Sequence, residues 1–420
     1  MASYIRNIFT LASGAVLGQL VVLVALPLMA KFYTPEHFGF AQASLSVLTI
    51  LLIVGALRLE IGVLSVPEAE LDDLFRCAWW LSMLTTAIAM LIAVSLAFLQ
   101  PEWTEGQRIA AILLPLLGLF ACWNQLMAYL GLRRHAFGPS ARAKVVQPVG
   151  YATSALGIGA IHGSPAGLLL ADAFGRAVAS AYIARALGFK PGQLAPPSWR
   201  LLRNTLSRHR ELAGIGLVSA LINAAGSAFT AVMLLWLFGA FEAGQYAMVD
   251  RMVGMPVGLL SAAISQVFMA NLSKSVSSGD FYAARIDYLR VLRVQTLTGV
   301  PIALLVFFVA PVVLDLLLGD GWETAGVYVR ALTVLYLCSY IAGPLNMTLT
   351  VLGRQRLQLI WDCMRLTIIG GAWGAIWLMS LEPGTALWVY SISSFVAYGA
   401  YLVIADWAMR RPVLITGVST

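Results

Sequence analysis

The sequence has 420 residues, of which 60% are hydrophobic and only 11% are charged. Soluble domains are about half apolar and about one quarter charged, so this chain has too few polar residues to cover a water-exposed surface, and lipid must cover much of it. The net charge of +7 could indicate a nucleic-acid partner, but Lys and Arg lie in short segments between apolar stretches, which argues against nucleic acid.

Apolar stretches predict an all-α integral membrane protein of about twelve transmembrane helices. The first stretch is too long for the apolar core of a cleaved signal peptide, so we expect it to be retained as a helix. Most stretches approach or exceed the roughly 20 residues that span a bilayer, and the weakest is the fifth. They cover residues 11–30, 40–66, 74–99, 109–130, 144–162, 166–187, 212–238, 243–272, 294–317, 325–351, 357–380 and 385–408.

The distribution of basic residues predicts the orientation. With the N-terminus inside, 20 of the 27 Lys and Arg residues fall in cytoplasmic ends and loops and only three, Lys31, Arg108 and Arg330, in outer loops. The other four lie within helices. This positive-inside distribution predicts an even number of helices and places both termini in the cytoplasm.

The longest predicted cytoplasmic segment lies at mid-chain. Residues 188–211 are basic and contain three prolines, so we interpret them as a linker between an N-terminal six-helix lobe, 1–187, and a C-terminal six-helix lobe, 212–420. No loop is large enough for a folded soluble domain, and the sequence has no Gly-rich phosphate loop and no CxxC or other metal-ligand spacing. The sequence therefore predicts no catalytic residues, no metal and no cofactor.

An internal repeat supports the two lobes. Asn124 and Gly131 near the end of the fourth helix match Asn346 and Gly353 near the end of the tenth at one offset, 222. A looser match, at an offset of 205, pairs Phe38-Gly39-Phe40-Ala41 with Ala243-Gly244-Gln245-Tyr246. Repeats of equal orientation predict halves related by an axis along the membrane normal, a design in which transporters rock two lobes around a central site.

Eight charged side chains fall inside predicted helices, where each requires a partner, an aqueous cavity or a task. Asp172 and Arg176 are four residues apart, and Asp362 and Arg365 are three apart. Both spacings place the two side chains on one helix face. We therefore interpret these four residues as structural ion pairs, with a role in the transport path as the alternative.

The other four charges cannot pair within one helix. Arg58 and Glu60 point roughly 200° apart, and Asp250 and Arg251 roughly 100° apart. Arg58 and Arg251 occupy matching positions of the two lobes, where two guanidinium groups would suit a phosphate or pyrophosphate. The alternative is that Arg58 pairs with an acid such as Asp172 or extends toward the cytoplasmic face. Glu60 and Asp250 would be counter-ions or would bind a coupling ion.

Two regions resemble a known family. The segments Leu11-Ala-Ser-Gly-Ala-Val-Leu-Gly-Gln-Leu20, Phe32-Tyr-Thr-Pro-Glu-His-Phe-Gly39 and Leu57-Arg-Leu-Glu60 are similar to the N-terminal region of polysaccharide-biosynthesis flippases. These are the O-antigen, capsule and exopolysaccharide translocases of the multidrug/oligosaccharidyl-lipid/polysaccharide (MOP) exporter superfamily. Ala243-Gly244-Gln245-Tyr246-Ala247, with Arg251 and Pro256, resembles the helix-eight region of the same family.

The resemblance implies two six-helix bundles in a V shape, alternating access and a multi-pass protein of the bacterial inner membrane. It implies that the substrate is a short glycan on undecaprenyl pyrophosphate, carried to the periplasmic leaflet, with Arg58 and Arg251 in a cationic cavity. The first helix lacks the basic residue that relatives such as the lipid II flippase carry there. Expected partners are membrane lipids and, as candidates, a glycan polymerase and a chain-length regulator.

Proton or sodium coupling is the expected energy source, because the sequence has no nucleotide motif. One alternative function is a multidrug exporter of the MATE type in the same superfamily, which unpaired acids in the cavity would favour. The other is a membrane-embedded glycosyltransferase or polymerase, although such enzymes usually carry a large outer loop or clustered catalytic acids.

Overall fold

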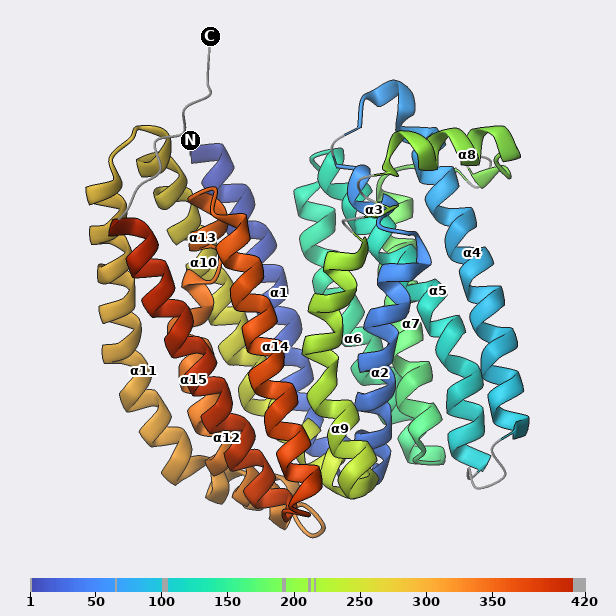
Figure 1. Cartoon of the computed structure of the whole chain (residues 1–420). Coiled ribbons are helices and arrows are strands. Elements are labelled where there is room, and N and C mark those ends of the chain that lie inside the picture. The colour runs from blue at the N-terminus through green and yellow to red at the C-terminus, as the bar shows by residue number, and fades with distance from the viewer. Residues whose placement is uncertain are drawn as a thin grey trace. The chain divides into compact units, whose positions relative to one another are not determined.

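The computed structural model describes residues 2–64, 66–99, 105–190, 194–210, 213–214 and 217–410. These residues are helical almost throughout, as Figure 1 shows. The helices are α1 (Ala2–Met29), α2 (Pro35–Gly55), α3 (Leu59–Gly62), α4 (Glu68–Leu99), α5 (Glu105–Arg133), α6 (Phe137–Ile161), α7 (Pro165–Ala186), α8 (Trp199–Arg208), α9 (Leu217–Val249), η3 (Asp250–Gly254), α10 (Met255–Ser277), α11 (Phe281–Leu318), α12 (Glu323–Ala342), η4 (Gly343–Leu345), α13 (Thr348–Val351), α14 (Gln355–Leu378) and α15 (Pro383–Arg410).

The sequence supplies local signals at several helix starts. Pro35 and Pro165 occupy the first positions of α2 and α7, where a missing N–H costs nothing. Ser164 Oγ accepts a hydrogen bond from the Gly167 N–H at 3.1 Å. Asp280 Oδ1 accepts one from the Ala283 N–H at 2.8 Å before α11. These caps satisfy donors that the first turn of a helix leaves without partners.

The chain forms two compact units, Met1–Ala247 and Met248–Thr420. In the first unit, α6 packs against α1 and α7, and α5 packs against α7. Glycines permit these close contacts: a Cβ at Gly14 would overlap the Ala141 carbonyl group, and Gly150 lies against Gly175. Small residues at helix contacts are the usual means of close packing in membranes, which explains why the fifth predicted stretch is rich in glycine.

In the second unit, α12 packs against α11 and α15, and α14 packs against α15. Its core contains large aromatic side chains whose polar atoms bond to backbone carbonyls. Tyr401 Oη donates to the Leu345 carbonyl at 2.9 Å, Tyr288 Oη to Leu402 at 3.0 Å and Trp361 Nε1 to Ala397 at 3.0 Å. Each bond satisfies a buried donor that would otherwise destabilise an apolar core.

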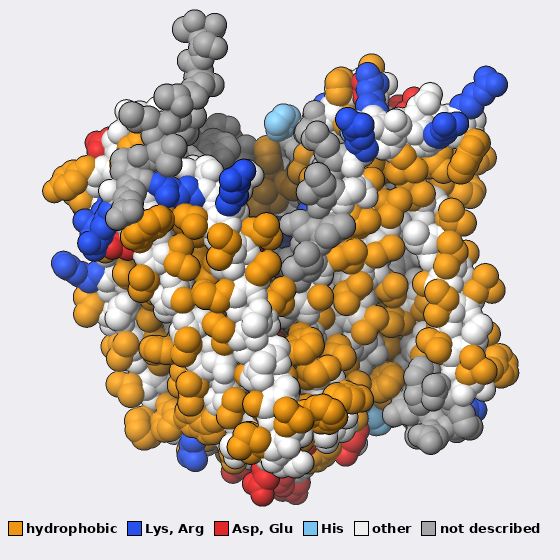
Figure 2. All heavy atoms as spheres, viewed as in Figure 1, with side chains coloured by type: hydrophobic (Ala, Val, Ile, Leu, Met, Phe, Trp, Pro, Cys, Tyr) orange, Lys and Arg blue, Asp and Glu red, His pale blue; other side chains and the backbone are white. Residues whose placement is uncertain are grey.

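Within the described residues, nine segments are long and apolar enough to cross a membrane. One of them, Ala228–Ser277, combines two predicted stretches, and α1 contributes only a shorter apolar helix, Ser13–Met29. Hydrophobic side chains cover the flanks of the long helices, and Lys and Arg gather near helix ends (Figure 2). The protein is therefore a multi-pass, all-α membrane protein, while the count of twelve and the orientation of the termini stay predictions.

Two predicted helices are wrong in their boundaries. The stretch 40–66 is α2, a turn and the short α3, and the stretch 325–351 is α12, η4 and α13. Hydropathy does not detect such breaks, because the profile averages over a window of about 19 residues and each break is much shorter than that. By contrast, the predicted separation between 238 and 243 is present as a kink at Gly239, whose φ of 86° suits glycine.

The predicted linker, 188–211, contains a helix that the sequence analysis missed. Helix α8 runs across the long helices of its unit (Figure 1) and contacts α4, where Arg208 forms an ion pair with Glu70 at 2.8 Å. Residues 191–193 and 211, with Pro191, lie outside the described residues. The compact units divide at Ala247, after this segment, and the division into lobes at 188–211 stays a prediction.

The two segments of the looser repeat lie against each other in the first unit. A Cβ at Gly39 would overlap the Ala240 carbonyl, and a Cβ at Gly244 would overlap the Pro35 carbonyl. The start of α2 and the part of α9 after Gly239 therefore meet backbone to backbone, and this contact requires glycine.

We predict that Gly244→Ala lowers the stability of the protein by about 1–3 kcal/mol, because the new methyl group must displace backbone. Gly399→Ala in α15 is the control, since a Cβ there would meet no described atom within 4 Å. Thermal unfolding of both variants in detergent measures the difference, and equal unfolding temperatures would contradict the close contact.

Candidate functional site

Arg58 lies in a break of the helical backbone. Helix α2 ends at Gly55, Leu57 and Arg58 adopt left-handed conformations with φ of 49° and 64°, and α3 begins at Leu59. Such conformations disfavour residues with a Cβ by about 1–2 kcal/mol each and often mark functional positions. The prediction that Arg58 and Glu60 share a continuous helix is wrong, and the angle of roughly 200° between them does not apply.

Glu60 is the more deeply buried member of this pair. Its exposed fraction is 3%, and its Oε2 accepts no hydrogen bond from any described residue. Arg58 is half-buried and interacts electrostatically with Glu60. A buried carboxylate oxygen without a bonded donor is costly, which makes Glu60 a candidate for binding a proton or a cation.

Arg133 fixes the chain that follows this turn. Its Nη1 donates to the Leu64 carbonyl at 2.9 Å, and its Nη2 donates to the Val66 carbonyl at 2.7 Å. The guanidinium also lies 3.4 Å from Glu68 Oε2. In the sequence, Arg133 is one of the 20 basic residues in the predicted cytoplasmic ends and loops, and this role was not predicted. Its position at the end of α5, next to the repeat motif, was the available indication of a structural role.

Asp172 and Arg176 form the predicted ion pair on α7. Arg176 Nε lies 2.6 Å from Asp172 Oδ2, and Asn124 Nδ2 donates to the Arg176 carbonyl at 3.1 Å. Cys122 on α5 interacts electrostatically with both Glu60 and Arg176. The alternative partner for Arg58, Asp172, is therefore engaged by Arg176. Electrostatic interactions therefore connect four charged residues of the first unit: Arg58, Glu60, Asp172 and Arg176.

The second unit holds Asp250 and Arg251 on a π-helical turn, η3. Tyr336 Oη donates to Asp250 Oδ1 at 3.5 Å, and Gly254 leaves the space that the carboxylate occupies, since a Cβ there would overlap Asp250. Arg251 is buried, with an exposed fraction of 5%. Single π turns are frequent at functional sites because they redirect side chains out of the regular helical pattern.

Asp362 and Arg365 are an exception to the predicted pairs. They are absent from the ion pairs of the described residues, and the Arg365 guanidinium lies over the Trp361 ring, 5.2 Å from its centre. A cation over the face of Trp is attracted by the π electrons, which offers Arg365 an alternative to its carboxylate neighbour. Asp362 nevertheless interacts electrostatically with Arg365, so the ion pair at this position stays a prediction.

The sequence analysis also missed a three-charge cluster between α11 and α15. Arg285 Nε lies 2.8 Å from Asp406 Oδ1, and Arg410 Nη2 lies 2.6 Å from Asp406 Oδ2. Both oxygens of the Asp406 carboxylate are therefore engaged by arginines. In the described part of the chain, no group of three or more His, Cys, Asp or Glu side chains is placed to hold a metal ion.

A double-mutant cycle at Asp172 and Arg176 tests whether the ion pair has a structural role. Removing one partner leaves the other charge half-buried, so Asp172→Asn or Arg176→Gln should each lower stability by about 2 kcal/mol. The double variant should recover part of that loss. Thermal unfolding measures the cycle. Strictly additive losses would show that the pair does not stabilise the fold.

Comparisons with known proteins agree with this architecture. A family model described as "Polysaccharide biosynthesis protein" matches residues 28–326. A multidrug resistance MATE family transporter of the MOP superfamily, inward-facing, is similar with a TM-score of 0.70, 14% identity and coverage of 93% of this chain and 94% of that chain. A MOP superfamily transporter from Pyrococcus furiosus has a TM-score of 0.63, 14% identity and coverage of 97% and 96%. The comparison with curated protein sequences finds no match.

At 14% identity the structural likeness establishes the fold, which is that of the MOP transporters. The family match extends over more than half of the chain, from α1 into α12. The resemblance that the sequence indicates is thereby confirmed. The protein belongs to the polysaccharide biosynthesis protein family, as a multi-pass membrane protein with the fold of the MOP transporters.

Proposed function

We propose that the protein is a flippase that moves an oligosaccharide linked to undecaprenyl pyrophosphate from the cytoplasmic to the periplasmic leaflet of the bacterial inner membrane. The observation that carries the proposal is a buried arginine at an irregular turn of a membrane-spanning segment, Arg251 on η3, in a chain of the polysaccharide biosynthesis family. Arg251 interacts electrostatically with Asp250, and ionisable residues within membrane-spanning segments commonly mark substrate or ion pathways.

Arg58 supports the same chemistry from the first unit. Arg58 lies on a left-handed turn, is half-buried and interacts electrostatically with Glu60, as Arg251 does with Asp250. Arginine binds phosphate with two parallel donors, which suits a pyrophosphate.

In this proposal Glu60 and Asp250 accompany the arginines as counter-ions, and Glu60 also couples transport to a proton or a sodium ion. Its buried Oε2, which accepts no bond from the described residues, supports the coupling role. Protonation would remove a desolvated negative charge, so occupancy of this site would change the balance of charge beside Arg58.

The second candidate is a multidrug exporter. It is favoured by the solved structures of similar fold, which include a MATE multidrug transporter in complex with R6G, with a TM-score of 0.63, 15% identity and 96% of both chains covered. The buried acids Glu60 and Asp250 would serve an organic cation. The glycosyltransferase alternative has less support, because the similarity to the fold of an exporter covers 93% of this chain.

We predict that Arg58→Ala and Arg251→Ala each reduce translocation of a fluorescent polyprenyl-pyrophosphate oligosaccharide in proteoliposomes by about tenfold or more, because a hydrogen bond to a charged group contributes about 1.5–3 kcal/mol. Lys at either position should restore part of the activity by restoring charge. Arg290→Ala is the control, since its side chain is 71% exposed.

Membrane levels of each variant are measured in parallel. Full translocation by the Arg58→Ala/Arg251→Ala protein would overturn the cationic site. Efflux of a cationic dye by wild-type protein that does not bind the polyprenyl pyrophosphate would instead establish the multidrug exporter.

A second prediction concerns the π turn. Gly254→Ala should lower translocation severalfold, because the methyl group displaces the Asp250 carboxylate from Tyr336. Gly258→Ala, one turn later on α10, should leave translocation unchanged, because a Cβ there would meet no described atom within 4 Å. Equal activity of the two variants would remove Asp250 from the site.

A further inference from the structure

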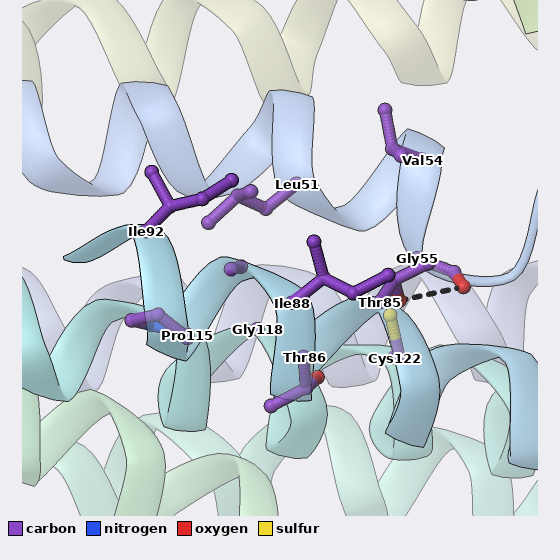
Figure 3. Close-up of a pocket in the computed structure, with 11 residues that line it drawn as sticks. Leu51, Val54, Gly55, Thr85, Thr86, Ile88, Ile92, Pro115, Gly118 and Cys122 are labelled. Carbon is purple, nitrogen blue, oxygen red and sulfur yellow. Dashed lines mark hydrogen bonds between the residues drawn. The ribbon is translucent and has the colours of Figure 1, made fainter. Parts of the chain in front are cut away.

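The first unit contains a cavity of about 260 Å³ between α2, α4 and α5. Figure 3 shows side chains from these three helices around it, among them Leu51, Ile88, Ile92 and Pro115. Its lining is almost wholly apolar. The hydroxyl of Thr85 is engaged, since it donates to the Gly55 carbonyl at 3.0 Å, so the cavity offers little polarity to water. An apolar cavity of this kind accepts hydrocarbon rather than water.

The cavity reaches the surface that lipid covers. Ile88 and Ile92 on α4 line it and remain 50% and 55% exposed. At its other end lie Gly55, the last residue of α2, and Cys122, which contacts Gly55 and interacts electrostatically with Glu60. The cavity therefore runs from the outer flank of the unit to the turn that carries Arg58.

The internal repeat allows this cavity to be compared with its counterpart in the second unit, which is smaller. The corresponding cavity of the second unit, between α10, α11 and α12, measures only about 40 Å³. At the repeat offset of 222, Gly118 corresponds to Tyr340, and both residues line their respective cavities. Tyr340 is anchored there, because its Oη lies 3.2 Å from Thr298 Oγ1 and its carbonyl accepts from Gln295 Nε2 at 3.1 Å. The first unit thus has a glycine at the position where a tyrosine narrows the cavity of the second unit.

We propose that the cavity between α2, α4 and α5 binds the isoprenoid chain of the substrate at the end nearest its pyrophosphate. This inference rests on the proposed function and extends it. A ligand with a pyrophosphate head and an isoprenoid chain would place the head beside Arg58 and the start of the chain in the adjoining cavity. A glycan without the chain would leave the cavity empty. The cavity holds only a short part of a long chain, so the remainder stays in lipid.

Photo-crosslinking tests the proposal on the full-length protein in proteoliposomes. The probe is a polyprenyl pyrophosphate monosaccharide with a diazirine on the isoprene units next to the pyrophosphate, and the comparison probe is a phosphatidylcholine with a diazirine in its acyl chain. We expect isoprenoid adducts on residues 85–92 and 115–122 that unlabelled polyprenyl pyrophosphate competes away. Equal labelling by phosphatidylcholine, or labelling that does not compete, would show an ordinary lipid-filled groove and overturn the proposal.

Two substitutions fill the cavity. Gly118→Tyr reproduces the second unit, and Ala89→Phe places a ring among the lining residues. Each should reduce the adducts by about tenfold. Ala87→Phe is the matched control on the same helix, because Ala87 is exposed and does not line the cavity. Unchanged adduct yield in both filled variants would overturn the proposal.

The same vesicles report translocation of the glycan by the wild-type protein. Translocation without isoprenoid adducts would refute the cavity assignment and leave the proposed function intact. Absence of both binding and translocation would refute the proposed function itself. The competition experiment needs only wild-type protein, so the outcome does not depend on the folding of the variants.

Discussion

The constraint on which this structure depends is that backbone polar groups surrounded by lipid must find partners within the protein. Continuous helices meet it automatically, so each interruption of a membrane helix requires specific support. The chain has such interruptions at Leu57 and Arg58, where the backbone is left-handed, and at η3, where it is π-helical. Arg133 bonds the carbonyls that follow the first, and Gly254 provides room at the second. Irregular backbone and intramembrane charge thus occur together in each unit.

This coincidence connects the fold to the proposed chemistry. Transporters commonly build binding sites from discontinuous helices, because an interrupted helix can direct charged groups at a ligand. The local ion pair of Asp172 and Arg176 lies on a continuous helix, without an interruption of the backbone. The difference in backbone therefore distinguishes the pair that stabilises the first unit from Arg58 and Arg251, the charges that the proposed function assigns to the substrate.

The repeat explains both likeness and difference between the units. Matching helices frame a cavity in each, but Gly118 and Tyr340 make those cavities unequal. Duplication supplies two similar frames, and the side chains that line them leave in the first unit a larger space, which we propose to bind the isoprenoid chain. The contact at Gly39 and Gly244 further shows that segments matched by the repeat can become neighbours in space.

The sequence by itself determined the membrane environment, the helical class, the family and the residues worth testing, because hydropathy, charge and spacing are properties of consecutive residues. It also predicted the Asp172–Arg176 pair, which depends only on helical spacing. The tertiary structure decided the features that depend on contacts distant in the chain. The turn at Arg58 is supported by Arg133, α8 lies against α4, and Arg365 stacks on Trp361. A hydropathy profile averages over many consecutive residues and does not resolve short breaks within an apolar stretch. The breaks, and the distant residues that contact them, are therefore defined only by the packing of the helices.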